Sequence, residues 1–392
     1  MSFTISALQR RLSKLPACAS VQCWTHRYST SPSKLTLPPH AEWRKLFTPI
    51  PPPLRDRVSL ANPITADAVA RSFIGEGSIA SGSNKIIIEA FPGPGTLSRA
   101  LLALDSSRVR KLIILEDSEQ YLEFLRPLEA ADPRVVVVPL SGYNWETYLH
   151  LEENGLFKDI ETVPWENGVH PQLHFISHIP HTVLGEQLVA QFFRNIPDRS
   201  WLFKYGRVPM SFVLGEWIWD RATAPAGKTL ARCKVSVISE ATAQMAVTLP
   251  PNNLLPYDNH FHPRIRKTME KRPESRRMGH PLVTANVVPH AEQIIESGQL
   301  DKWDYCLRRL FVRKGTPLKT AITTLGPGAE TLLKMLTDPS LPPAEILDIQ
   351  KSPRELNIAE WALVVRAFSS WPFAPDTLSV YEAFSTQNRI RG

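Results

Sequence analysis

The chain has 392 residues, of which 43% are hydrophobic and 21% charged, and its formal net charge at pH 7 is +7. This composition is typical of a soluble globular protein that buries a sizeable core, and it excludes a disordered or fibrous chain. No window approaches the roughly 18 consecutive apolar residues of a membrane-spanning helix, so we expect no membrane contact. The four cysteines lack the spacing of a metal site, and we predict neither a structural disulfide nor a bound metal.

The N-terminal segment is basic and contains no acidic residue before Glu42. It carries five cations: Arg10, Arg11, Lys14, Arg27 and Lys34. An acid-poor segment rich in Arg and Ser is typical of a mitochondrial transit peptide, and residues 3–15 can form a basic amphipathic helix. We therefore predict a transit peptide over residues 1–35, cleaved after Tyr28, and a location in the mitochondrial matrix; an untargeted disordered tail is the alternative. Because these cations supply five of the seven net positive charges, the overall charge is poor evidence for nucleic-acid binding.

Short apolar segments alternate with amphipathic ones after a proline-rich lead at residues 49–53. In chain order, the expected elements are a helix at 65–74, a strand at 85–89, a helix from Thr96, a strand at 111–116, a helix at 118–128, a strand at 134–138, a helix at 145–153, a strand at 172–176, a helix at 183–193, a strand at 200–204, a helix at 208–219, and strands at 233–238 and 282–288. This alternation predicts a mostly parallel, doubly wound α/β sheet with ligand loops at the carboxyl ends of its strands.

From about residue 291 the pattern becomes helical. The expected helices cover residues 293–297, 303–311, 318–323, 330–336 and 358–368. We therefore predict a Rossmann-like domain over residues 36–290 and a smaller all-helical domain over residues 291–392, with no internal repeats.

A glycine turn between an expected strand and an expected helix is the most informative feature. Gly93 and Gly95 lack a Cβ and so let the backbone approach a ligand, and Glu116, which ends the next strand, is placed to accept hydrogen bonds from ribose hydroxyls. The strict G-x-G-x-x-G pattern fails because a third glycine is missing, which favours S-adenosylmethionine over a dinucleotide. Glu89, before the turn, is placed to hold the amino-acid end of that cofactor. A tight turn that only joins packed elements is the alternative.

A second feature is the basic stretch at residues 264–278, which holds seven Lys or Arg residues against Glu270 and Glu274. Such a stretch suits contacts with phosphates, and a solvated loop is the alternative. A shorter basic segment follows the expected strand at 200–204, where we expect it to face the ligand crevice. The candidate nucleic-acid contacts are Lys204, Arg207, Arg264, Arg266, Lys267, Lys271, Arg272, Arg276 and Arg277, with Arg389 and Arg391 near the C-terminus.

The order and spacing of these features resemble the rRNA adenine N6-dimethyltransferase family over about residues 55–372. Besides the glycine turn and Glu116, residues 175–181 lie where that family has an Asn-Leu-Pro-Tyr motif after its fourth strand. Residues 255–263 resemble its proline-rich loop, and residues 310–314 and 353–358 resemble parts of its helical domain. The resemblance implies a class I S-adenosylmethionine-methyltransferase fold with a C-terminal helical domain.

The family contains rRNA dimethylases of the small ribosomal subunit and mitochondrial transcription factor B proteins. In the enzymes, the Asn side chain accepts a hydrogen bond from the target amine, and the aromatic residue stacks on the flipped adenine. In this chain His178 replaces that Asn and His181 replaces the Tyr, on either side of Pro180. These three residues are the candidate catalytic residues if activity is retained, because a neutral imidazole still offers one acceptor.

Two further departures surround the same site. The acid that the family places after the third strand is absent around Ser141, and the family's Gln-Asn-Phe-Leu-like motif is unrecognisable at residues 59–63. We therefore expect a mitochondrial transcription initiation factor that binds the mitochondrial RNA polymerase and melted promoter DNA, with S-adenosylmethionine binding weak or lost. The alternative is an active, S-adenosylmethionine-dependent dimethyltransferase of the mitochondrial small-subunit rRNA.

Overall fold

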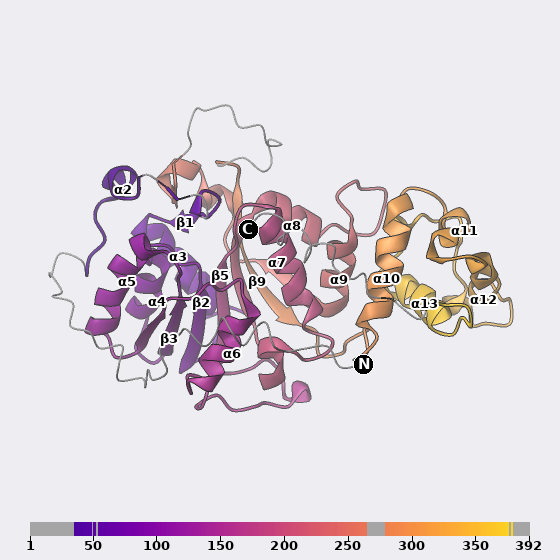
Figure 1. Ribbon diagram of the computed structural model, residues 1–392, viewed down its shortest axis with the longest axis horizontal. Coiled ribbons are helices and arrows are strands. Elements are labelled where there is room, and N and C mark those ends of the chain that lie inside the picture. The colour runs from indigo at the N-terminus through magenta and orange to yellow at the C-terminus, as the bar shows by residue number, and fades with distance from the viewer. Residues whose placement is uncertain (1–34, 49, 52–53, 265–278, 376–377, 379–392) are drawn as a thin grey trace, which may run out of the picture.

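The computed structural model describes residues 35–48, 50–51, 54–264, 279–375 and 378, which form a layered α/β sheet followed by a group of helices (Figure 1). The sheet has seven strands in the order β4-β3-β2-β5-β6-β9-β7. In that order their bounds are Val135–Val138, Val109–Leu115, Lys85–Ala90, Leu173–His178, Met210–Gly215, Leu282–Pro289 and Ala243–Val247. The first five are parallel, and β9 pairs antiparallel with both β6 and β7. The predicted mostly parallel α/β sheet is confirmed.

Helices cover both faces of the sheet because successive side chains of its buried strands point to opposite sides. On β2, Ile87 joins one hydrophobic cluster, while Ile86 and Ile88 join the other. The helices of the first face are α3 (Pro63–Ile74), α4 (Thr96–Ala103) and α5 (Glu119–Ala131), and those of the second include α6 (Trp145–Glu153) and α7 (Val183–Arg194). This layering places the loops after β2, β3 and β5 at one common edge of the sheet.

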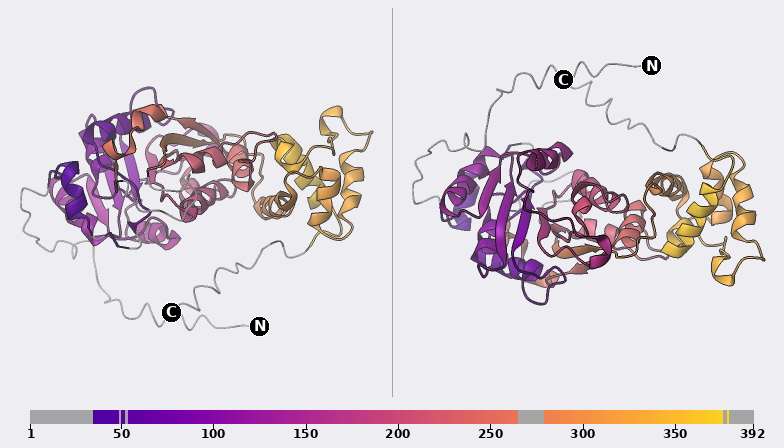
Figure 2. Two further views of the ribbon diagram at one scale, coloured as in Figure 1. Left: turned by 90° about the horizontal axis from the view of Figure 1, so that it is seen from above. Right: turned by 90° about the horizontal axis from the view of Figure 1, so that it is seen from below.

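The described residues beyond β9 contain helices and no strand, and they lie at one end of the molecule (Figure 2). The longer helices there are α10 (Leu300–Leu310), α11 (Leu318–Ala321), α12 (Leu332–Leu336) and α13 (Ile358–Ser369). Their core is continuous with the sheet's second face, because Leu307 and Trp361 belong to the same hydrophobic cluster as Phe175 of β5. The predicted helix at 293–297 is wrong, since this segment consists of bends and turns. The domain boundary at residue 290 stays a prediction.

The predicted helix at 208–219 is wrong, because the structure has strand β6 followed by α8 (Glu216–Ala222). The apolar run of β6 pairs with β5 on one side and β9 on the other, and every residue of the strand is buried. Periodicity cannot distinguish a short apolar run in a helix from a central strand. Hydrogen bonding to the two neighbouring strands makes this run a strand.

The two predicted strands at 200–204 and 233–238 are also wrong. The first is a short 3₁₀ helix, Trp201–Tyr205, which follows a tight turn where the non-glycine residue Arg199 has a φ of 48°. The second is α9 (Lys234–Thr242), which is tied to α8 by a 2.5 Å hydrogen bond from Ser239 Oγ to a backbone carbonyl. The β-branched residues of this segment favour a strand, and packing against α8 overrides that preference.

Three small elements that the sequence analysis does not predict lie near the carboxyl edge of the sheet. They are α2 (His40–Leu46), β1 (Ser59–Leu60) and β8 (Phe261–His262), and β1 pairs antiparallel with β8. The predicted transit peptide, except for its last residue, and its helix at 3–15 lie outside the described residues. Among the residues that the structure describes, no helix has both the length and the apolar character needed to cross a membrane.

Candidate functional site

The glycine turn lies between β2 and α4, as the sequence predicts. Gly93 and Gly95 have φ values of 64° and 88°, a region that residues with a Cβ rarely adopt. A Cβ on Gly93 would lie 2.6 Å from Ser59 Cβ, and closer still to its hydroxyl oxygen. A Cβ on Gly95 would lie 2.5 Å from the side chain of Leu125 in α5. The space in front of both glycines is therefore filled by the chain's own side chains.

The acid that follows β3 is also satisfied from within the chain. Glu116 is fully buried, and its Oε2 accepts hydrogen bonds from the backbone N–H of Gly93 (3.2 Å) and from the guanidinium of Arg57. Its Oε1 accepts a 3.0 Å bond from the backbone N–H of Ser118. The second guanidinium nitrogen of Arg57 donates to Asp117 Oδ1 at 2.8 Å. The carboxylate placed to receive ribose hydroxyls thus already holds an arginine.

Arg57 lies in an aromatic cage as well as in an ion pair. Its guanidinium lies 5.0 Å from the ring centre of Phe91 and 5.7 Å from that of Tyr121, and only 7% of the residue is exposed. Burial lowers the pKa of Arg57, but the adjacent Glu116 carboxylate outweighs this effect and leaves the pKa raised. The arginine is therefore a permanent, buried counter-ion for Glu116.

The segment around α2 packs against Tyr121, whose ring contacts Arg57. Trp43 and Phe47, which are both buried, form edge-to-face contacts with His262 of β8 at 5.5 Å. Phe47 also contacts Tyr121 and Phe124 of α5, with ring centres 5.3 and 5.6 Å apart. These contacts hold α2 against α5 and β8 and so cover the carboxyl edge of the sheet beside β3.

Glu89 and His178 meet beneath the same edge, at the ends of β2 and β5. His178 Nε2 lies 3.8 Å from Glu89 Oε1, while Glu89 Oε2 accepts a 2.6 Å hydrogen bond from Ser98 Oγ. Burial raises the pKa of Glu89 to about 7 and lowers the pKa of His178 to about 4. At pH 7 His178 is therefore a neutral imidazole, buried with only 2% of its surface exposed.

His181, the other candidate catalytic residue of this loop, is packed inward. It is 2% exposed, its backbone N–H donates to the carbonyl of Asp56 at 2.8 Å, and its ring contacts Trp217 edge to face at 6.3 Å. A Cβ on Gly215 would lie 2.6 Å from His181 Nδ1, so β6 presses directly on the ring. Pro180 is half-buried beside it. The ring that would stack on a flipped base is thus inside the protein.

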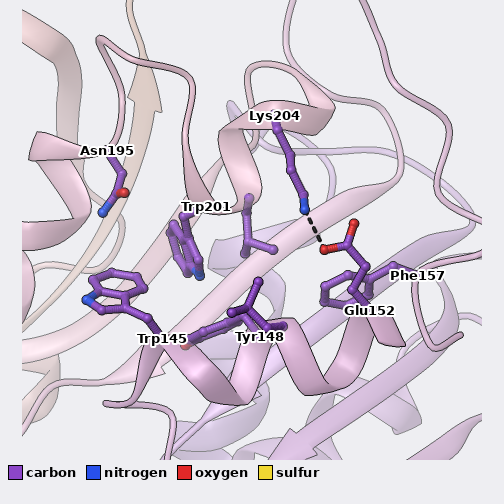
Figure 3. Close-up of a pocket in the computed structure, with 9 residues that line it drawn as sticks. Trp145, Tyr148, Glu152, Phe157, Asn195, Trp201 and Lys204 are labelled. Atoms are coloured by element: carbon purple, nitrogen blue, oxygen red, sulfur yellow. Dashed lines mark hydrogen bonds and ion pairs between the residues drawn. The ribbon is translucent and has the colours of Figure 1, made fainter. Parts of the chain in front are cut away.

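Lys204 and Arg207 lie at the opposite edge of the sheet from the glycine turn. They precede β6, whereas the turn follows the parallel strand β2, so the expectation that they face the ligand crevice is wrong. Lys204 Nζ bonds to Glu152 Oε2 at 2.5 Å on the rim of a pocket of about 210 Å³ that Trp145 and Trp201 line (Figure 3). Arg207 donates to a backbone carbonyl at the end of β9.

The remaining candidate contacts belong mostly to the basic stretch at 264–278. Arg264 is exposed just after β8. The pKa of His40 in α2 is lowered mainly by burial and also by the positive charge of Arg264. The other candidates lie outside the described residues: Arg266, Lys267, Lys271, Arg272, Arg276, Arg277, Arg389 and Arg391. Within the described part of the chain, no group of three or more His, Cys, Asp or Glu side chains is arranged to hold a metal ion.

Arg57 is the residue of this site that sequence reasoning missed. It lies 59 residues before Glu116, outside every motif, and no spacing connects the two. Arg57 lies just before β1, which pairs with β8, and its side chain reaches Glu116 in the folded chain.

The packing of Gly93 leads to a testable expectation. We expect Gly93→Ala to destabilise the protein by about 2 kcal/mol, because the new methyl group meets Ser59 and the residue keeps a positive φ. Ser59→Gly in the same chain should recover about half of this loss, since it removes the clash and leaves only the backbone strain. Urea unfolding of the two single variants and the double variant measures the coupling. Independent, additive effects would show that Ser59 does not fill the space in front of Gly93.

Comparisons with known proteins converge on one group. A family model described as ribosomal RNA adenine dimethylase matches residues 69–341. The mitochondrial transcription factor 1 of Lachancea kluyveri is 25% identical over 299 residues, covering 74% of this chain and 82% of that protein. The protein of the same name from Saccharomyces cerevisiae is 26% identical over 307 residues, with the same coverage.

A relative named as a dimethyladenosine transferase is also similar to this chain. The mitochondrial dimethyladenosine transferase 1 of Vermamoeba vermiformis is 21% identical over 329 residues, covering 75% of this chain and 84% of that protein. Among solved structures, the 23S rRNA methyltransferase ErmE is 13% identical with a TM-score of 0.47, covering 79% of this chain and 98% of that chain.

Proposed function

The chain belongs to the ribosomal RNA adenine dimethylase family, and from that premise we propose that it is a mitochondrial transcription initiation factor. In this role it binds the mitochondrial RNA polymerase and stabilises melted promoter DNA in the mitochondrial matrix. Its similarity to two proteins named mitochondrial transcription factor 1 supports the role. It has the fold of the S-adenosylmethionine-dependent methyltransferases, and the packing of the described residues around Gly93 and Glu116 supports a loss of their cofactor.

The observation that carries this proposal is the buried ion pair between Arg57 and Glu116. Ribose hydroxyls would need Glu116 as an acceptor, and Glu116 already accepts from Arg57, Gly93 and Ser118. Ser59 occupies the approach to Gly93. These residues do not fit a bound S-adenosylmethionine, which supports weak or lost binding of the methyl donor.

The proposed role in initiation follows from the energetics of strand opening. Melting a promoter costs base-stacking energy, and a protein offsets that cost when it contacts phosphates with cations and stacks unpaired bases on aromatic side chains. The basic stretch from Arg264 to Arg277 is the proposed contact for the melted strand. Its described end, Arg264, is exposed close to α2, which supports an approach of DNA from the carboxyl edge of the sheet.

The second candidate function is methylation of the mitochondrial small-subunit rRNA. In that case Glu89, Gly93, Gly95 and Glu116 would hold S-adenosylmethionine, and His178, Pro180 and His181 would orient the adenine. The specific observation in its favour is that burial lowers the pKa of His178 to about 4, so that its neutral ring offers an acceptor. The packing of Arg57 and His181 speaks against it.

Calorimetric titration of the full chain with S-adenosylmethionine, with S-adenosylhomocysteine as the control ligand, separates the two functions. We expect no heat of binding at micromolar concentrations, because displacing Arg57 would leave a buried guanidinium without its carboxylate. Micromolar binding, followed by methyl transfer to small-subunit rRNA, would instead establish the enzyme.

A transcription assay then tests the proposed role directly. Run-off transcription by the mitochondrial RNA polymerase from a duplex promoter should require the chain, whereas transcription from a pre-melted promoter should depend on it much less. Equal transcript yields with and without the chain on the duplex promoter would overturn the initiation role.

A further inference from the structure

A loop between α8 and α9, residues 223–233, contacts segments next to the C-terminal helices. Its residue Arg232 is fully buried and donates to the carbonyl of Ala224 at 2.8 Å, to Glu240 Oε2 at 2.7 Å and to the carbonyl of Leu356 at 3.1 Å. A fully buried arginine with three partners fixes the backbone around it. The loop is therefore anchored to α9 and to the segment that precedes α13.

Two further segments are fastened to this loop. Lys314, after the 3₁₀ turn Phe311–Arg313, donates from Nζ to the carbonyl of Leu230 at 2.7 Å. The backbone N–H of Gly227 donates to the carbonyl of Arg354 at 3.0 Å, and the N–H of Arg354 donates to the carbonyl of Lys314 at 3.2 Å. These bonds join three segments that are distant in sequence into one continuous surface.

This surface presents apolar side chains to solvent at two points. Leu230 is 76% exposed and Val312 is 78% exposed, although the backbone beside each is held by the bonds above. A single exposed aliphatic residue is normal on a protein surface and needs no explanation. Two of them on adjoining, fastened segments form a pre-organised contact of the kind that interfaces use.

The charges around these two residues are mostly positive, with Glu355 as an acid among them. Lys228 and Arg313 are exposed, and Lys314 and Arg354 are half-buried. The carboxylate of the adjoining Glu355 accepts hydrogen bonds from the backbone and hydroxyl of Ser352 at 2.9 and 2.6 Å, and these bonds lower the pKa of Glu355 before the charges of Lys228 and Arg354 add to the effect. The basic apolar platform is our name for the surface formed by Lys228, Leu230, Val312, Arg313, Lys314 and Arg354.

We propose that the basic apolar platform docks a protein partner, through a segment in which acidic side chains flank aliphatic or aromatic ones. The cations complement the acids, and Leu230 and Val312 bury apolar area against the partner. A nucleic acid is a poorer occupant, because its phosphates would lie against the two aliphatic side chains. The identity of this partner rests on the function proposed above: it is the mitochondrial RNA polymerase, and the platform is the surface that binds it.

The test compares two double variants of the full chain. Leu230→Ser with Val312→Ser removes the apolar part of the platform without touching its internal bonds. The matched control is Ile64→Ser with Phe373→Ser, which removes two aliphatic or aromatic side chains of similar exposure, 82% and 75%, at sites outside the platform. Affinity for the polymerase and for single-stranded promoter DNA is measured by fluorescence anisotropy at one fixed salt concentration.

We expect the platform variant to bind the polymerase about tenfold more weakly, as truncation of interface anchors does, with DNA affinity unchanged. The control variant should match the wild type in both measurements. Lys228→Glu with Arg313→Glu should also weaken polymerase binding, and this loss should shrink as salt is added.

The outcomes separate this inference from the proposed function. If the wild type binds the polymerase and both serine variants bind it equally well, the platform is not the docking surface, and the initiation role stands. If the platform variant loses DNA affinity and keeps polymerase affinity, the surface serves nucleic acid and the inference is overturned. A wild-type chain that binds no polymerase would overturn the proposed function together with this partner.

Discussion

Arg57→Ala is expected to lower the free energy of unfolding by about 3–5 kcal/mol, because it leaves the fully buried Glu116 without its counter-ion. The loss also removes the guanidinium from between Phe91 and Tyr121, which stack on it. Urea unfolding of the variant and the wild type measures the difference. The exposed pair of Arg71 and Asp67 on α3 gives the control, since Arg71→Ala should leave stability nearly unchanged.

A second variant distinguishes a lost ion pair from a lost side chain. Glu116→Gln added to Arg57→Ala removes the unpaired buried charge, so the double variant should be more stable than Arg57→Ala alone. If instead the two changes add, the pair does not stabilise the fold. Calorimetric titration of Arg57→Ala with S-adenosylmethionine extends the test, because micromolar binding by this variant but not by the wild type would show that Arg57 closes the cofactor site.

Arg232→Ala is expected to cost about 3 kcal/mol of unfolding free energy. It creates a cavity and leaves the carbonyls of Ala224 and Leu356 without a donor where the loop meets the C-terminal helices. We also expect faster proteolytic cleavage within residues 223–231, since the loop loses its anchor. Thermal unfolding and limited trypsin digestion measure the two effects.

The control for Arg232 is Arg366→Ala on α13, which removes an exposed ion pair with Glu345 and should change neither measurement appreciably. Arg232→Met keeps much of the volume and removes the bonds, so it should fall between alanine and the wild type. Wild-type stability in Arg232→Ala would mean that water replaces the guanidinium, and the loop would then be held by the bonds of Lys314 and Gly227.

Periodicity predicts those parts of the fold correctly where the local residue types themselves favour the observed secondary structure. The strand at 85–89 and the turn at Gly93 and Gly95 lead into α4 as expected, because a β-branched run followed by glycines permits few other conformations. The run at 210–215 lies within a predicted helix, and its own residues do not reveal that β5 and β9 pair with it on either side. The strand predicted at 200–204 covers a short apolar run, and the structure forms a 3₁₀ helix there.

The sequence predicts that Glu116 lies near Gly93, but it does not predict that Glu116 forms an ion pair with Arg57. Glu116 lies beside Gly93 at the expected edge, and the two are joined by a hydrogen bond of 3.2 Å. That Glu116 is already paired could not be read from the sequence, because Arg57 reaches it through a contact across 59 residues. Long-range pairs of single residues leave no periodic pattern, so they come only from the folded structure.

Because Arg57 neutralises Glu116 from within the chain, this contribution to the free energy of unfolding does not depend on the concentration of a small molecule. A protein that holds a diffusible ligand gains stability in proportion to the logarithm of that ligand's concentration. Here the group that neutralises Glu116 is part of the same chain, so its effective concentration is set by a covalent tether and never varies. On the proposed function, in which no methyl donor is bound, the folded population should therefore be the same in a cell rich in methyl donor as in one that is depleted of it.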